Sequence, residues 1–358
     1  MPGEIARTHR CLDECRVNGS EVIVRGWILH REGGHLQHVD VEVFSPREYR
    51  VQSVALQASP DLARAYPDSA GAAQSRFLVT VVTADQAPVE NSPEPLLLVL
   101  RASFSTGQTS SWCVAWNLLT LPATMLDRVG GAPEVGCEFL GYFLDYAKLQ
   151  RDSHVLDLGC GVGRMAIPLQ AYLSPAGRYW GFDVDRVAIE WCVNAIEKLD
   201  PRFRFRHVPA RNAAYNPRSK TALTDLRLEV AAESVTFACA ASLFTHLRAG
   251  DARHYWQELG RVLRPGGRVL ATAFLVDPAG ANRMTLQGKE LSFVPVDADT
   301  WTTDVAIPEK ATGFPRTLFS SWAEAAGLQL EQFIPGTWNG RPDGQSCQDM
   351  LVFTKRGA

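Results

Sequence analysis

The stretch "HVLDLGCGVGR", residues 154–164, places three glycines directly after a short apolar run that contains an aspartate. Gly159, Gly161 and Gly163 follow a G-x-G-x-G spacing. A nucleoside triphosphate loop of the Walker type needs Gly-Lys-Ser/Thr, whereas Arg164 follows the last glycine here. A dinucleotide loop needs the wider G-x-G-x-x-G spacing, in which a helix N-terminus holds a pyrophosphate. The compressed loop therefore favours a smaller nucleoside ligand without phosphate.

Two acidic residues flank this loop at the ends of predicted strands. Asp157 stands two residues before Gly159, where its carboxylate suits a cationic amine. Asp183, in "YWGFDVD", ends the next predicted strand, the position from which a carboxylate accepts hydrogen bonds from ribose hydroxyls. A nucleoside that carries an amino acid would satisfy both carboxylates.

The pattern of apolar residues divides the chain into two parts. Up to residue 120, short runs such as "EVIVRGWIL" and "RFLVTVVT" alternate with period two, which predicts a small all-β sandwich domain. Residues 121–132 are predicted to form a linker. In residues 133–358, nearly continuous apolar strands alternate with helices, which is typical of an α/β domain with helices on both faces of a parallel sheet.

Four landmarks in the second part occur in a consistent order: "VLDLGCGVGR", "GFDVD", "SLFTHL" and "LGRVLRPGGRVLAT". In these residues the chain resembles the class I S-adenosylmethionine (SAM)-dependent methyltransferases over about residues 133–355. The resemblance implies a seven-stranded, mostly parallel Rossmann-like sheet whose last strand, "DMLVFTK", is reversed. It also implies SAM as the cofactor and S-adenosylhomocysteine as the product.

The resemblance carries over to particular residues. Asp157, Gly159 and Gly161 would line the methionyl end of SAM, Asp183 would bind the ribose, and Val184 would flank the adenine. Family members often carry an acid near the adenine amine, but Pro209 lies near that position, so Arg211 or Asn212 would serve instead. The predicted cofactor-binding residues are Asp157, Gly159, Cys160, Gly161, Gly163, Arg164, Asp183, Val184, Arg211, Asn212 and Ser242.

The acceptor side offers three candidate side chains. His246 in "SLFTHL" is the candidate general base, because this loop borders the donor pocket in the family; the alternative is that it only caps or packs the following helix. Trp338 and Arg341 lie in a Gly/Pro-rich loop and would bind a planar or sugar-like acceptor; the alternative is a hairpin whose tryptophan fills the sheet edge. Residues 276–316 are predicted to be an insertion that adds acceptor-side wall.

Composition limits the possible partners. The net charge is −3, without any block of basic residues, so no nucleic-acid partner is expected. The longest aliphatic run, "LLLVL", is far short of the roughly 20 residues that cross a membrane. The eight cysteines form no C-x-x-C pair, and His30, His35 and His38 are poorly spaced for a metal, so we expect a cytoplasmic protein without a metal site.

Together with these limits, the resemblance to SAM-dependent methyltransferases implies an enzyme that methylates a hydroxyl of a small molecule or sugar in bacterial glycan or natural-product biosynthesis. The sandwich is faintly similar to β modules of bacterial enzymes that build or decorate cell-surface glycans. The alternatives are N- or C-methylation, or a SAM-binding adaptor whose sandwich binds a carbohydrate or a protein. A homodimer is compatible with the sequence.

Overall fold

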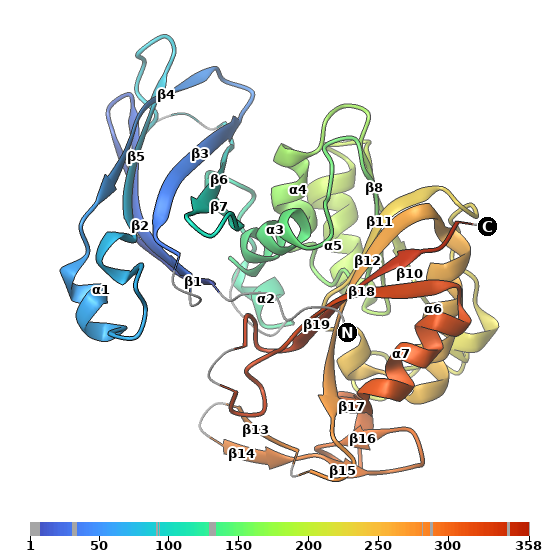
Figure 1. Cartoon of the computed structure of the whole chain (residues 1–358). Coiled ribbons are helices and arrows are strands. Elements are labelled where there is room, and N and C mark those ends of the chain that lie inside the picture. Colours follow the sequence, from blue (N-terminus) through green and yellow to red (C-terminus); the bar gives the residue numbers. More distant parts are fainter. Residues whose placement is uncertain are drawn as a thin grey trace.

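The computed structural model describes residues 8–30, 34–90, 92, 94–128, 134–280, 282–286, 289–341 and 344–357. The N-terminal strands form one part of the molecule and the α/β sheet forms the other (Figure 1). Of the predicted linker, residues 129–132 lie outside the described residues. Of the predicted insertion, residues 281 and 287–288 lie outside them.

Two antiparallel sheets build the N-terminal part, as predicted. One has the order β1-β2-β5-β4 and the other β3-β6-β7. Valines and isoleucines at every second position of β2 are buried between the sheets, which explains the period-two pattern. The first strand was not anticipated, because charged residues interrupt the alternation in "THRCLDECRVN". The elements are β1 (Thr8–Asn18), β2 (Glu21–His30), β3 (Leu36–Phe44), β4 (Tyr49–Gln57), α1 (Pro60–Ala65), β5 (Arg76–Thr83), β6 (Leu96–Phe104) and β7 (Thr109–Trp116).

The second part is built on a seven-stranded sheet of order β10-β9-β8-β11-β12-β19-β18. The first five strands are parallel, while β19 runs antiparallel to β12 and to β18. The predicted Rossmann-like sheet with a reversed last strand is confirmed. Its strands are β8 (His154–Leu158), β9 (Arg178–Asp183), β10 (Phe203–His207), β11 (Val235–Ala240), β12 (Leu263–Val276), β18 (Leu328–Ile334) and β19 (Asp349–Lys355).

Helices cover both faces of this sheet (Figure 1). In β8, Val155 packs into the apolar cluster under α3, α4 and α5, whereas Leu156 packs into the cluster under α6 and α7. Burial on both faces is the reason why these strands read as continuous apolar runs. The helices are α2 (Ala123–Leu126), α3 (Val135–Asp145), α4 (Ala166–Tyr172), α5 (Arg186–Cys192), α6 (Ala249–Val262) and α7 (Arg316–Ala325).

The segment between β12 and α7 forms a small extension of the sheet. Strand β17 pairs in parallel with the last residues of β12, and β16 and β15 follow it as antiparallel neighbours. The extension therefore begins at the carboxyl end of β12. It consists of β15 (Val294–Pro295), β16 (Trp301–Thr302) and β17 (Thr312–Pro315), whereas β13 (Arg283–Leu286) and β14 (Lys289–Ser292) form a separate two-stranded antiparallel sheet.

The sandwich packs directly on the helices of the second part. Phe44 and Leu97 belong to the same buried cluster as Phe139 of α3 and Leu169 of α4. The carboxylate of Asp145 accepts the backbone N–H of Ser111 at 2.8 and 2.9 Å. The β3-β6-β7 sheet thus shares its core with the α/β sheet.

Within the described part of the chain, no helix has the length and apolar character needed to span a bilayer. The described residues also contain no group of three or more His, Cys, Asp or Glu side chains that could hold a metal ion.

Candidate active site

The glycine loop follows β8 and is built by backbone conformations that glycine alone adopts easily. Gly159 and Gly163 have φ angles of 76° and 79°. A Cβ on Gly163 would lie 3.0 Å from Cδ1 of Ile196 and 3.2 Å from Sγ of Cys192. The backbone N–H groups of Gly159 and Cys160 both donate to the carbonyl of Phe182, which ties the loop to the end of β9.

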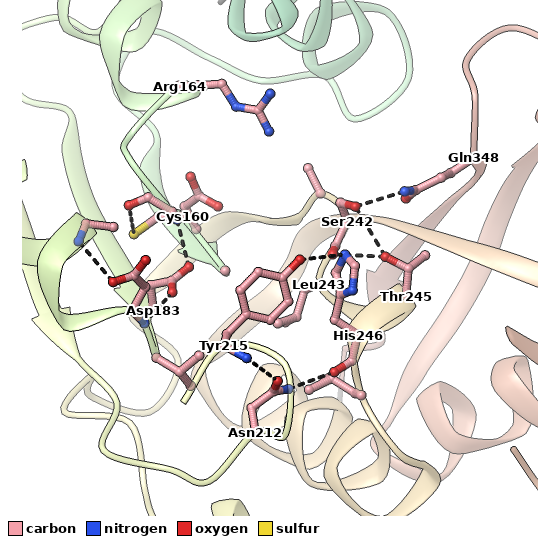
Figure 2. A pocket seen from close by; sticks show the side chains of 18 of the residues that line it. Cys160, Arg164, Asp183, Asn212, Tyr215, Ser242, Leu243, Thr245, His246 and Gln348 are labelled. Atoms are coloured by element: carbon pink, nitrogen blue, oxygen red, sulfur yellow. Dashed lines mark hydrogen bonds between the residues drawn. The ribbon is translucent and has the colours of Figure 1, made fainter. Parts of the chain in front are cut away.

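A cavity of about 600 Å³ lies next to this loop (Figure 2). Ten of the eleven predicted cofactor-binding residues line it, the exception being Gly163, and so does His246. Open α/β sheets bind ligands at the carboxyl ends of their strands, and this cavity occupies that place. Further residues that line the cavity include Arg128, Glu138, Phe139, Asp185, Ala210, Tyr215, Leu223, Asp251, Phe274, Met284, Lys310, Ala311 and Gln348.

Asp183 at the end of β9 is held by two backbone donors. Its Oδ2 accepts the N–H of Gly161 at 2.8 Å, and its Oδ1 accepts the N–H of Asp185 at 2.7 Å. Burial raises the pKa of this carboxyl above its ordinary value, and the two N–H bonds partly oppose the shift. Each oxygen keeps a lone pair for a further donor, such as a ribose hydroxyl.

Asp157 lies deeper, with 1% of its surface exposed. The hydroxyl of Tyr179 donates to its Oδ2 at 2.5 Å. Burial raises the pKa of Asp157 to about 6. Arg164 lines the same cavity, and burial lowers the pKa of its guanidinium. A carboxylate and a guanidinium that face one cavity suit the ammonium and carboxylate of an amino acid.

His246 ends a short 3-10 helix, η4 (Phe244–His246), and is held in one orientation. Its Nδ1 lies 2.9 Å from the backbone carbonyl of Glu309. A carbonyl only accepts, so Nδ1 carries the hydrogen and Nε2 of the neutral ring keeps its lone pair. Burial lowers the pKa of His246 below its ordinary value, which favours this neutral form.

Asn212 and Arg211 lie on the loop that follows β10. Oδ1 of Asn212 accepts the N–H groups of Ala214 and Tyr215, both at 3.0 Å. Its Nδ2 donates to the carbonyl of His246 at 2.9 Å. The amide of Asn212 therefore already binds three groups of the protein, whereas Arg211 has an exposed side chain at the cavity.

Ser242 follows β11 with a φ of 61°, which is uncommon for a serine and recurs at functional sites. Its N–H donates to Oγ1 of Thr272 at 2.7 Å, and its Oγ accepts Nε2 of Gln348 at 2.8 Å. The hydroxyl of Thr272 in turn donates to Oε1 of Gln348. These bonds fix the Gln348 amide at the cavity (Figure 2).

The two predicted acceptor-binding residues do not line the cavity. Trp338 has 4% of its surface exposed, packs against Phe274 and Phe293, and donates from its indole to Asp349 at 2.8 Å. Arg341 pairs with the same Asp349 at 3.5 Å. The apolar contacts and the buried carboxylate of Asp349 keep Trp338 inside the protein. This matches the alternative in which the tryptophan fills the sheet edge and does not bind the acceptor.

The sequence motifs do not mark every residue of the cavity, and Arg128 and Tyr215 are two that they leave out. Arg128 follows α2 in the predicted linker and pairs with Asp185, and Tyr215 lies beside His246. Both contacts join residues more than 30 positions apart, and no local motif marks either residue.

The arrangement fits a nucleoside that carries an amino acid. Asp157 and Arg164 offer opposite charges, Asp183 retains lone pairs, and Val184, Ala210 and Leu223 add apolar surface for a planar base. A mostly parallel sheet of this order, with a G-x-G-x-G loop and carboxylates at two strand ends, is typical of the class I SAM-dependent methyltransferases.

Comparisons with known proteins agree with this class. Residues 155–267 match the family model described as "Methyltransferase domain". A curated relative, the "probable cobalt-precorrin-6B C(15)-methyltransferase (decarboxylating)" of Thermoplasma volcanium, is 27% identical over 99 residues, which cover 28% of this chain and 49% of the relative. The chain thus spans about half the length of that relative.

Solved structures resemble part of the chain. A TehB-like SAM-dependent methyltransferase from Corynebacterium glutamicum is 19% identical, with a TM-score of 0.36 and coverage of 59% of this chain and 84% of the other. A SAM-dependent methyltransferase from Mesorhizobium loti is 15% identical, with a TM-score of 0.43 and coverage of 63% and 99%. Residues 155–267 thus match the methyltransferase domain family, and the chain combines a mostly parallel Rossmann-like methyltransferase sheet with an N-terminal β-sandwich. SAM is the cofactor of this family.

Proposed function

We propose that the chain transfers a methyl group from SAM to a hydroxyl of a small molecule. The observation that carries the proposal is that one cavity joins the glycine loop, Asp183 and the lone pair of His246 Nε2. A volume of about 600 Å³ lies within the range of small-molecule sites.

The donor end of the cavity would hold SAM through charged side chains at its methionyl end and a carboxylate that accepts hydrogen bonds from its ribose hydroxyls. Asp157 would bind the methionyl ammonium, Arg164 the carboxylate and Asp183 the ribose diol, while Val184 and Leu223 would contact the adenine. SAM bound at this end would supply an electrophilic methyl group on a sulfonium sulfur.

His246 would act as the general base. Nδ1–H stays on the carbonyl of Glu309, so Nε2 is the nitrogen that takes the proton of an acceptor hydroxyl. The lowered pKa leaves the ring neutral at pH 7, ready to accept a proton. The oxygen that loses its proton can then attack the methyl group.

The acceptor end combines apolar walls with a few polar groups. Phe139, Phe274 and Met284 provide apolar surface, and Gln348 offers amide hydrogens in a fixed orientation. Met284, Lys310 and Ala311 come from residues 276–316, which supports their role as acceptor-side wall. We infer that the acceptor is a hydroxylated natural product or sugar.

All eight cysteines are free, including two with exposed side chains, which supports a reducing compartment and a cytoplasmic location. Homodimer formation stays a prediction, to be measured by sedimentation.

Calorimetric titration of SAM and S-adenosylhomocysteine tests the donor site. We expect micromolar binding to the unmodified protein, at least a tenfold loss for Asp183→Ala, and no change for Asp68→Ala, an exposed residue of the sandwich. Absence of binding, or full binding by Asp183→Ala, would contradict the proposed site.

Transfer itself is measured with methyl-labelled SAM and bacterial extracts of hydroxylated small molecules. His246→Gln should lower the rate about 10²-fold while SAM binding persists. Intact binding with no labelled product would favour the adaptor, and a labelled product unaffected by His246→Gln would favour an acceptor that needs no such base.

A further inference from the structure

Tyr215 lies directly beside the candidate base. Its hydroxyl oxygen is 3.4 Å from Nε2 of His246, and the two rings meet edge to face at a centroid distance of 5.1 Å. Both side chains line the cavity, and Figure 2 shows the phenol pointing toward the imidazole. Tyr215 is 45% exposed, so the side chain is also open to solvent.

The loop that carries Tyr215 is held in place by its own hydrogen bonds. Asn212 accepts the N–H of Tyr215, and the backbones of Asn212 and Asn216 bond to each other in both directions. The side chain of Asn216 donates to the carbonyl of Ala210 at 2.9 Å. The loop conformation is therefore fixed where the tyrosine leaves it.

One residue connects this loop to the histidine. The amide of Asn212 binds the N–H of Tyr215 with its oxygen and the carbonyl of His246 with its nitrogen. Asn212 is 7% exposed. A single buried amide thus sets the position of both side chains relative to each other.

The direction of the hydrogen bond between the rings follows from the tautomer. Nδ1 carries the hydrogen, because the carbonyl of Glu309 only accepts. Nε2 is then an acceptor, so the hydroxyl of Tyr215 is the donor. Partial burial raises the pKa of Tyr215, so this hydroxyl is protonated at pH 7.

We propose that Tyr215 and His246 together form the binding site for the acceptor oxygen, with Asn212 as the positioning residue. The inference rests on the proposed function and deepens it. The incoming hydroxyl takes the place of the bond between the rings, donates its hydrogen to Nε2 and accepts one from Tyr215.

The step balances with groups already named. The proton of the acceptor hydroxyl goes to Nε2, and a lone pair of the oxygen forms the new O–C bond. The electron pair of the broken S–C bond stays on sulfur, which becomes neutral. Tyr215 keeps its proton and donates to the negative charge that develops on the oxygen. The imidazolium then releases its proton to solvent.

The measurement uses ¹⁵N-labelled protein saturated with S-adenosylhomocysteine, so it needs no acceptor. Imidazole nitrogen shifts report the tautomer and the pKa of His246, which is assigned by comparison with His246→Gln. The other charged and titratable side chains on the cavity wall stay unchanged in every variant. They are Arg128, Glu138, Asp157, Cys160, Arg164, Asp183, Asp185, Arg211, Asp251, Tyr255, Lys310 and Cys347.

In the unmodified protein we expect Nε2 to be unprotonated and hydrogen-bonded. Tyr215→Phe removes a donor that stabilises the neutral ring, so the Nε2 signal should move and the pKa of His246 should rise. Asn212→Ala removes the acceptor for the Tyr215 N–H and the donor to the His246 carbonyl without adding a charge, so it should disturb the same nitrogen. Tyr66→Phe, in the sandwich, should leave it unchanged.

An Nε2 signal and pKa that do not respond to Tyr215→Phe would overturn the inference. So would an Nε2 that carries the hydrogen. Binding of S-adenosylhomocysteine is measured in the same samples. If the unmodified protein does not bind it, the proposed function is contradicted. If it binds but Nε2 does not respond to Tyr215→Phe, only the Tyr215–His246 site is contradicted. With a known acceptor, Tyr215→Phe should lower kcat/KM about 3–10-fold.

Discussion

Arg128 and Asp185 form a bidentate ion pair. Nε of the guanidinium lies 2.7 Å from Oδ2 of the carboxylate, and Nη2 lies 2.7 Å from Oδ1. Asp185 is also the N-cap of α5, where it accepts the N–H groups of Val187 and Ala188. Since both partners line the cavity, the segment after α2 is fastened to the donor end of the site.

Replacing Arg128 with alanine should weaken binding of S-adenosylhomocysteine about 3–10-fold, because the segment loses its attachment to the cavity. The N-cap remains, and a partly exposed ion pair contributes only about 0.2–1 kcal/mol to stability, so the Tm should change little. Calorimetry and a thermal melt measure the two effects. Arg186→Ala is the control, because Arg186 also pairs on α5 but is 75% exposed; equal effects of both variants would contradict a specific role of Arg128.

This pair also marks what the sequence could not reveal. The glycine loop, Asp157 and Asp183 were found because strand ends and turns are encoded by adjacent residues. Arg128 was assigned to a linker because the segment around it is short and rich in turn residues, and its partner lies 57 positions away. A contact of this kind depends on how the folded elements meet.

For Trp338, the sequence does not show whether the side chain is exposed or buried. The loop rich in Gly and Pro is compatible with a tryptophan that binds the acceptor and with one that fills the sheet edge, and the structure shows the ring buried against Phe274 and Phe293. The buried acceptor for its indole, Asp349, is the first residue of β19. The loop sequence alone does not show whether an aromatic ring points outward or back into the core.

Asp157→Asn should separate stability from donor binding. At pH 7 the carboxylate is charged although it is buried, which costs about 3 kcal/mol when a pKa of about 6 is compared with the ordinary value near 3.9. An amide avoids this cost and still accepts the Tyr179 hydroxyl, so the Tm should stay equal or rise. SAM affinity should fall at least tenfold, because the charge opposite the ammonium is gone. Asp145→Asn, a buried carboxyl at the sandwich contact, should leave SAM affinity unchanged; an unchanged affinity in Asp157→Asn would exclude its proposed role.

The same carboxyl predicts a pH dependence. Its folded pKa lies above that of the unfolded chain, so the stability contribution of the protonated form is present below about pH 4 and is lost as the pH rises through about 6. Donor binding should show the opposite trend, because the methionyl ammonium favours the carboxylate. SAM affinity should rise up to about pH 6 and then level off, with proton release on binding below that pH. Titrations in buffers of different ionisation enthalpy measure the released proton; no release at pH 5 would show that Asp157 does not face the ammonium.

The shared core predicts that the sandwich and the α/β sheet unfold together. The ring centroids of Phe44 in β3 and Tyr172 in α4 are 5.4 Å apart. The guanidinium of Arg151 lies 5.0 Å from the centroid of the Phe44 ring. Scanning calorimetry should therefore show one transition. S-adenosylhomocysteine should raise the Tm of that single transition, because a ligand stabilises the whole unit that must fold to bind it. Phe44→Ala should cost about 3–5 kcal/mol and lower the same single transition, whereas Val51→Ala, at an exposed position of β4, should have little effect. Two transitions, of which the ligand raises only one, would instead mean that the sandwich folds independently and that its contact with α3 and α4 adds little to the stability of the methyltransferase sheet.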